Sequence, residues 1–126
     1  NPGEQLYLAR NAGRFEEIVL GINLDGLGYR AGGTAYSLYE CPPEVAAAIH
    51  ETFAAHAGLA EGEPWYQGDH GLFLMNGRPA LAITSERVWE VMAEYVHTPQ
   101  DRPAVVDPGK LAEAATALGE LVLRLK

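Results

Sequence analysis

Two short runs of apolar residues, at positions 18–24 and 79–84, constrain the fold of this chain more than any other feature. The first run is rich in β-branched residues, follows the charged pair Glu16 and Glu17, and ends at Asp25. Runs of this length without polar alternation are typical of strands buried on both faces, as in the parallel sheet of an α/β protein. We therefore expect both runs to form strands that are buried on both faces, in a sheet that helices cover.

Segments with helical spacing lie between the expected strands. We expect a third strand over residues 34–40, helices over residues 5–14, 42–57, 69–75, 85–95 and 107–125, and a loop over residues 60–68. The apolar face predicted for the last helix consists of Leu111, Ala115, Leu118, Val122 and Leu125. Helices that alternate with strands predict an α/β protein, built as a three-layer α/β/α sandwich.

Length and charge exclude several classes of protein. A chain of 126 residues is about one domain long, which is enough to bury a core. Its 17 acidic and 9 basic side chains give a net charge of −8, which argues against binding to nucleic acid or to an anionic membrane. Cys41 is the single cysteine, which excludes a disulfide framework and permits the cytoplasmic location that we favour.

Polar residues gather where the expected elements end. Asp25 closes the first buried strand, at the carboxyl end where open α/β sheets place their sites. His97 and Asp101 follow an expected helix, and Asp69 and His70 follow an aromatic loop. One histidine and one carboxylate can share a zinc ion, although an aspartate at the end of a strand is about as often a loop cap or turn residue, and one at the start of a helix is usually a cap. These positions are therefore candidates, and the spacing alone does not decide between the two roles.

The order of these motifs resembles the zinc aminopeptidases of peptidase family M28. The matching segments are Asn-Leu-Asp at 23–25, Asp-His at 69–70, Gly-Arg-Pro-Ala at 77–80 and His-Thr-Pro-Gln-Asp at 97–101. The resemblance implies a phosphorylase/hydrolase-like sandwich with a mixed sheet. It also implies hydrolysis of amino-terminal residues from peptides, with two zinc ions in the complete site. Residues 1–126 then correspond to the carboxyl-terminal part of the catalytic domain.

The same resemblance assigns roles to individual residues. Asp25 is similar to the carboxylate that binds one zinc ion, and His97 is similar to the histidine that binds the other. Asp69 resembles an acid that lines the active site and is our candidate catalytic residue. Thr98, Asp101 and His70 are expected to support the metal ligands, because a metal-bound imidazole needs neighbours that fix its orientation.

Departures from the family pattern indicate an incomplete enzyme. The family's remaining metal ligands and its glutamate base precede the aspartate strand. The pair Glu16 and Glu17 leads directly into that strand and lies about 20 Å from Asp25, at about 3.3 Å per residue, so neither glutamate can be the base. Because the chain also begins at Asn1 rather than at methionine, we expect a missing amino-terminal half, or a homo-oligomer, and no activity of the chain alone.

Smaller departures affect the expected substrate contacts. Val96 stands where the family often has a tyrosine, and Gly68 and Arg102 replace a serine and a threonine. Two alternatives therefore stay open. The chain could be a non-catalytic α/β interaction module or degenerate relative, or it could belong to a glutaminyl cyclase-like enzyme, whose substrates carry an amino-terminal glutamine.

Overall fold

A computed structural model describes residues 2–126 and contains a four-stranded mixed sheet. Asn1, on which part of our expectation of an upstream segment rests, lies outside the described residues. The strands in chain order are β1 (Gly21–Leu24), β2 (Thr34–Tyr39), β3 (Leu59–Glu61) and β4 (Ala80–Ser85). Their order in the sheet is β1-β4-β2-β3, in which β1 is parallel to β4, β4 antiparallel to β2, and β2 parallel to β3.

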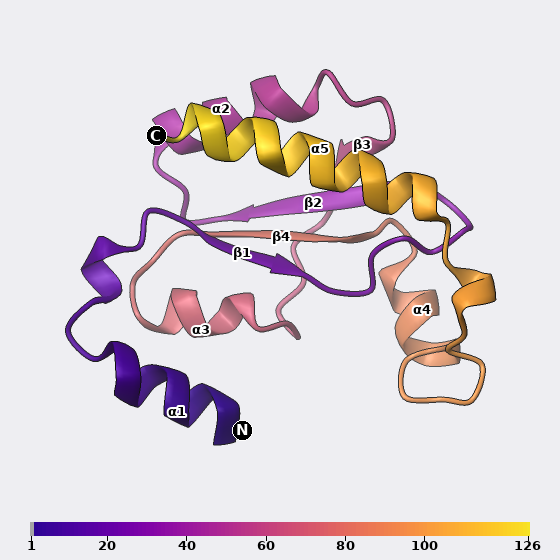
Figure 1. Cartoon of the computed structure of the whole chain (residues 1–126), viewed down its shortest axis with the longest axis horizontal. Helices are drawn as coiled ribbons and strands as arrows, with labels where there is room; N and C mark the ends of the chain where they lie inside the picture. Colours follow the sequence, from indigo (N-terminus) through magenta and orange to yellow (C-terminus); the bar gives the residue numbers. More distant parts are fainter. Residues whose placement is uncertain (1) are drawn as a thin grey trace.

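Helices cover both faces of this sheet. They are α1 (Pro2–Asn11), α2 (Pro43–Phe53), α3 (His70–Met75), α4 (Val88–Glu94) and α5 (Pro108–Arg124), with single 3-10 turns η1 (Phe15–Glu17) and η2 (Pro103–Val105). Helices α2 and α5 lie on one face, and α1, α3 and α4 lie on the other (Figure 1). The predicted three-layer α/β/α sandwich with a mixed sheet is therefore confirmed.

The main core lies between the sheet and the layer formed by α2 and α5. Ile49 and Phe53 of α2, Leu81 and Ile83 of β4, and Leu121 of α5 are fully buried there. Each such side chain contributes about 1.5–3 kcal/mol relative to its exposed state. Both apolar runs form strands, and β4 is buried along its whole length as expected, but β1 lies at the edge of the sheet and its Leu24 is 51% exposed.

The apolar face predicted for the last helix is wrong at several positions. Leu111 and Val122 of α5 are 40% and 46% exposed, whereas Ala114, Ala117 and Leu121 face the core. The two stripes lie side by side on the helix, and both satisfy a period of 3.6 residues. Alanine carries a weak hydrophobic signal, so the sequence pattern favoured the stripe with more leucine and valine.

Element boundaries also differ from the expectation. Strand β3 overlaps the first two residues of the expected loop at 60–68. The sequence did not indicate it because it is only three residues long and just one of them is buried. Helix α4 begins at Val88 rather than near Ser85, since Ser85 is the last residue of β4. In the described part of the chain, no helix is long and apolar enough to cross a membrane.

Candidate active site

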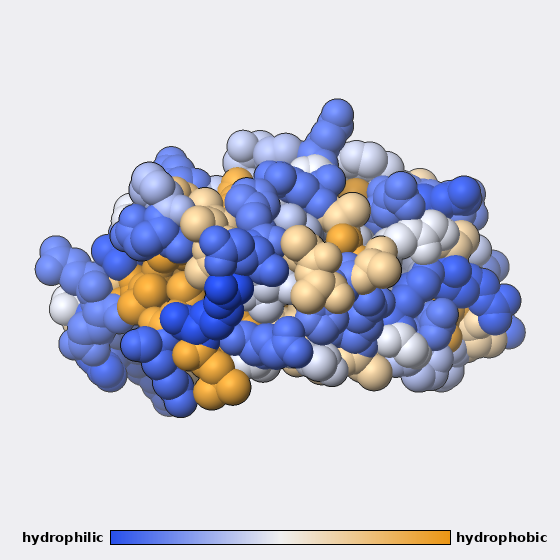
Figure 2. All heavy atoms as spheres, turned by 90° about the horizontal axis from the view of Figure 1, so that it is seen from above, coloured by the Kyte–Doolittle hydropathy of each residue, from blue (hydrophilic) through white to orange (hydrophobic). Residues whose placement is uncertain are grey.

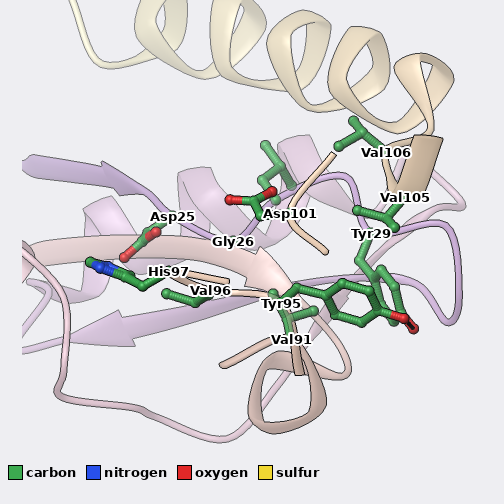
Figure 3. Close-up of a pocket in the computed structure, with 11 residues that line it drawn as sticks. Asp25, Gly26, Tyr29, Val91, Tyr95, Val96, His97, Asp101, Val105 and Val106 are labelled. Atoms are coloured by element: carbon green, nitrogen blue, oxygen red, sulfur yellow. Dashed lines mark hydrogen bonds between the residues drawn. The ribbon is translucent and has the colours of Figure 1, made fainter. Parts of the chain in front are cut away.

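Asp25 and His97 face one another at the carboxyl end of β1. Asp25 directly follows β1, and its amide extends the β1–β4 pairing by donating to the Ile83 carbonyl at 3.2 Å. His97 lies just beyond α4, and the two side chains point toward each other (Figure 3). Both are exposed, and both line a pocket of about 350 Å³, which we call the main pocket. The structure therefore brings these two predicted residues together.

A second, smaller hollow adjoins the main pocket. It measures about 190 Å³ and shares Asp25, Gly26, Val91, Val96 and His97 with the main pocket. Trp65, Gln67, Val88 and Met92 form its remaining walls. Asp25 and His97 thus line both cavities.

Ser85 fixes the loop that leaves Asp25. Its hydroxyl donates to the Gly26 carbonyl at 2.6 Å and accepts from the Tyr29 amide at 3.2 Å. Gly26 has a φ of +63°, and a Cβ there would lie 3.3 Å from the Thr84 hydroxyl. A glycine is required at this position because the backbone is left-handed and the space beside it is filled. The direction of the chain after Asp25 is consequently set by buried polar contacts.

His97 itself has an unusual backbone conformation. Its φ is +61°, in the left-handed region that costs a residue other than glycine about 1–3 kcal/mol. Thr98 holds the turn around it, since its hydroxyl donates to the Tyr95 carbonyl at 2.8 Å and accepts from the Gln100 amide at 3.3 Å. Thr98 thus contacts the backbone around His97 rather than its imidazole ring.

Asp101 does not engage the histidine segment through its side chain. Its amide donates to the Thr98 carbonyl at 3.1 Å, while its carboxylate makes no hydrogen bond or ion pair to any described residue. The side chain lines the main pocket instead (Figure 3). Thr98 and Asp101 were both expected to support His97. Thr98 contacts the backbone of the histidine segment, whereas the Asp101 side chain faces the cavity.

Two tyrosines close the far side of the main pocket. The Tyr29 hydroxyl donates to Glu90 Oε1 at 2.6 Å, and its ring centroid lies 5.2 Å from that of Tyr95. The hydrogen bond to Glu90, together with that to Tyr95 and burial, raises the pKa of Tyr29. The same bond, aided by the charge of Arg87, lowers the pKa of the Glu90 carboxyl. Sequence reasoning missed this pair, because no motif links positions 29 and 90.

His70 is a buried structural residue beneath β1. Its Nε2 lies 2.7 Å from the Trp65 carbonyl and its Nδ1 lies 3.2 Å from Asn23 Nδ2. A carbonyl only accepts, so we assign the proton to Nε2, which leaves Nδ1 to accept from the Asn23 amide. His70 is fully buried and does not line the main pocket. It contacts the strand that carries Asp25 through Asn23, two residues earlier.

The same contacts explain why position 68 carries a glycine. A Cβ on Gly68 would lie 2.6 Å from Asn23 Nδ2 and 2.7 Å from His70 Nδ1. Both atoms belong to a buried hydrogen bond and have no room to retreat. In this chain, a side chain at position 68 is incompatible with the Asn23–His70 pair.

Asp69 lies apart from the other predicted residues. It is exposed at the N-cap position of α3, where its side chain makes no capping hydrogen bond. It lines a separate hollow, formed with Tyr7 of α1 and Leu72 of α3, and neither cavity beside His97 includes it. The structure therefore does not bring Asp69 together with Asp25 and His97.

The donors present do not complete a zinc site. Zinc in proteins takes three or four side-chain ligands. Within residues 2–126, no group of three or more His, Cys, Asp or Glu side chains is placed to hold a metal ion. Glu16 and Glu17 lie in η1, before β1, whereas Asp25 follows that strand (Figure 1). Asp25 and His97 are two donors, which is fewer than a zinc site takes.

Solved structures share this fold. The chain superposes on an aminopeptidase from Aneurinibacillus sp. strain AM-1 with a TM-score of 0.74 and 22% identity, covering 95% of this chain and 29% of the aminopeptidase. It superposes on a candidate peptidase from Clostridium acetobutylicum with a TM-score of 0.70 and 21% identity, covering 94% of this chain and 28% of the other. No family model and no curated protein sequence matches the chain.

The chain thus has the α/β fold found in part of an aminopeptidase. It spans less than a third of the length of either solved structure. Similarity at this level of identity shows the fold alone, so the assignment to family M28 stays a prediction.

Proposed function

We propose that residues 1–126 form part of an M28-like zinc aminopeptidase domain and contribute Asp25 and His97 to its metal centre. The observation that supports this proposal is the meeting of these two side chains (Figure 3). The motif order singled them out, and they meet at the carboxyl end of a sheet whose fold an aminopeptidase shares.

The chain's own residues have separate tasks in this proposal. Asp25 and His97 are two zinc ligands, Thr98 holds the turn that presents the imidazole, and the buried Asn23–His70 pair stiffens β1 beneath Asp25. Bound zinc would polarise the scissile carbonyl and activate a water molecule. A catalytic role for Asp69 stays a prediction, because its side chain lines a different hollow.

The outer edge of β1 is the surface on which we propose that the rest of the domain packs. Among the described residues, no strand pairs with that edge. Val19 and Leu24, on either side of the strand core, are 56% and 51% exposed, and no residue of α1 is buried. Viewed from the side of α5, apolar side chains gather near the end of the molecule where α5 finishes (Figure 2). Open edges and exposed apolar side chains of this kind favour association with further protein.

A longer protein that includes the upstream coding sequence tests the proposed function directly. We expect it to contain zinc and to hydrolyse aminoacyl-p-nitroanilides. The variants Asp25→Ala and His97→Ala should lose both properties, whereas the matched surface variant Glu94→Ala should keep them. Normal zinc content and activity in the first two variants would show that the site assignment is wrong.

The same preparation distinguishes the alternatives. A glutaminyl cyclase-like enzyme would convert peptides with amino-terminal glutamine and would release no p-nitroaniline. An interaction module or degenerate relative would do neither, and would bind zinc no better than the Asp25→Ala variant.

A further inference from the structure

The main pocket extends from Asp25 and His97 into a cavity with apolar walls. Leu27, Val91, Val105 and Val106 line it (Figure 3). Its volume of about 350 Å³ is at the lower end of the range for small-ligand pockets, and it accommodates one long side chain. Walls of this kind suit an aliphatic stem rather than a short polar group.

The charges that face this cavity are of one sign. Its lining contains two carboxylates, from Asp25 and Asp101, and contains no lysine or arginine. In the proposed metal centre Asp25 is a ligand, which leaves the unpaired carboxylate of Asp101 for another partner. Two basic side chains lie outside this lining and are already engaged: Arg87 is paired with Glu90 at 3.3 Å, and the Lys110 ammonium donates to the Tyr29 carbonyl at 2.7 Å. The cavity consequently favours a cation.

The far end of the cavity adds two aromatic rings. Tyr29 and Tyr95 pack against each other there, and the Tyr29 hydroxyl is already occupied by its bond to Glu90. Because that hydroxyl donates to Glu90, the rings offer a guanidinium or ammonium their faces rather than a free proton donor. Tyrosine faces attract cations within about 6 Å of the ring.

We propose that the main pocket binds the side chain of a lysine or arginine residue of the substrate peptide. The aliphatic stem lies along Val105 and Val106, and the charged group lies between the Asp101 carboxylate and the tyrosine rings. This proposal rests on the proposed function for the statement that the bound residue belongs to a substrate. It names the substrate class as peptides with a basic residue next to the scissile bond.

Binding of single amino-acid amides to the 126-residue chain tests the proposal without zinc or catalysis. The probes are L-lysinamide, L-argininamide and L-leucinamide, and the signals are the NMR methyl resonances of Val105 and Val106. We expect saturable shifts with the two basic amides, at dissociation constants about fivefold lower than that of L-leucinamide, the effect of one partly exposed charge pair. The variant Asp101→Asn should abolish this preference. Glu94→Gln, which removes an equal charge from exposed α4 outside the pocket, should keep it.

Two results would overturn the proposal. One is equal or tighter binding of L-leucinamide, and the other is an unchanged preference for basic amides in Asp101→Asn. Failure of the proposed function gives a different pattern, in which the longer protein hydrolyses no anilide while the basic amides still shift the valine methyls. In an active longer protein, Asp101→Asn should lower the hydrolysis of lysyl and arginyl anilides relative to leucyl anilide.

Discussion

The Tyr29 hydroxyl donates a 2.6 Å hydrogen bond to Glu90 and so joins the loop after Asp25 to the helix before His97. The two candidate metal ligands come from segments far apart in the sequence: Asp25 lies shortly before Tyr29, and His97 lies shortly after Glu90. The Tyr29–Glu90 bond therefore connects the segment that carries Asp25 to the segment that carries His97.

The variant Tyr29→Phe should destabilise the chain in a pH-dependent way. The bond lowers the pKa of Glu90. Its contribution to the free energy of unfolding is therefore present above the ordinary pKa of 4.5 and is lost as the pH falls through the lowered pKa of the folded state. The bond also raises the pKa of Tyr29. The stabilisation linked to the Tyr29 hydroxyl is therefore present below the ordinary pKa of 10.0 and declines as the pH rises above that value. We expect the urea midpoints of wild type and variant to differ at pH 7 and to converge at pH 3. The exposed-tyrosine variant Tyr66→Phe serves as the control, and an equal effect in both variants would contradict the assignment.

Two glycine substitutions test the packing beneath β1. Gly68→Ala places a Cβ 2.6 Å from Asn23 Nδ2 and should destabilise the chain by about 1–3 kcal/mol. Gly71→Ala, three residues later in α3, meets no atom within 4 Å and should stabilise it by about 0.5–1 kcal/mol through helix propensity. Chemical denaturation of the two variants measures both changes. Similar stabilities of the two variants would mean that the Asn23–His70 pair can move to make room for a Cβ at position 68.

His70 should be more important for stability than for any chemistry. Replacing it with leucine removes the partner of the buried Asn23 side-chain amide, whereas the Trp65 carbonyl keeps its 2.6 Å hydrogen bond from the Tyr39 hydroxyl. One unsatisfied buried group costs about 1–3 kcal/mol, so His70→Leu should lower the free energy of unfolding by about 1–3 kcal/mol. The variant His56→Leu, at a half-buried side chain that contacts the 52%-exposed carboxylate of Glu120, leaves no buried group without a partner and should lower it by less than about 1 kcal/mol. An equal loss in both variants would count against a buried structural role for His70.

The sequence was most informative where a signal was long or repeated. The apolar runs that form β1 and β4 predict their strands without knowledge of the tertiary structure, but they do not distinguish the fully buried β4 from β1 at the edge of the sheet. The pairing of Asp25 with His97 could be anticipated only from the order of several short motifs. Neither residue carries a local pattern that distinguishes a ligand from a cap or a surface histidine.

The remaining features depend on contacts that no local pattern encodes. Strand β3 exists because β2 offers it an edge, and its own three residues carry almost no signal. The bond between Tyr29 and Glu90 joins positions 61 residues apart, and the exposure of Asp101 to the pocket depends on a turn that Thr98 closes. Tertiary placement, rather than residue type, decides the role of each of these side chains.

The open edge of β1 should make the isolated chain self-associate. Because Val19 is 56% exposed beside an unpaired strand, we expect dimers or larger species in sedimentation velocity at micromolar concentration. Val19→Lys should shift the distribution toward the monomer, since a charge at an edge opposes strand pairing. Met75→Lys, at a residue that is 77% exposed on α3, should leave the distribution unchanged. A monomeric wild type would remove the support that this edge gives to the proposed packing surface.

The left-handed backbone at His97 predicts an inverted order of stability for two substitutions. Alanine normally stabilises a chain relative to glycine by about 0.5–1 kcal/mol, because glycine loses more conformational freedom on folding. At a φ of +61°, alanine keeps the backbone strain and glycine relieves it, so His97→Gly should be more stable than His97→Ala by about 1 kcal/mol. Gln100, three residues later and without a positive φ, provides the matched pair, and there the alanine variant should be at least as stable as the glycine variant. Thermal and urea unfolding of the four variants measure both differences. The normal order at position 97 would show that the histidine is held without strain, whereas the inverted order would mean that the fold sacrifices stability to direct this imidazole toward Asp25.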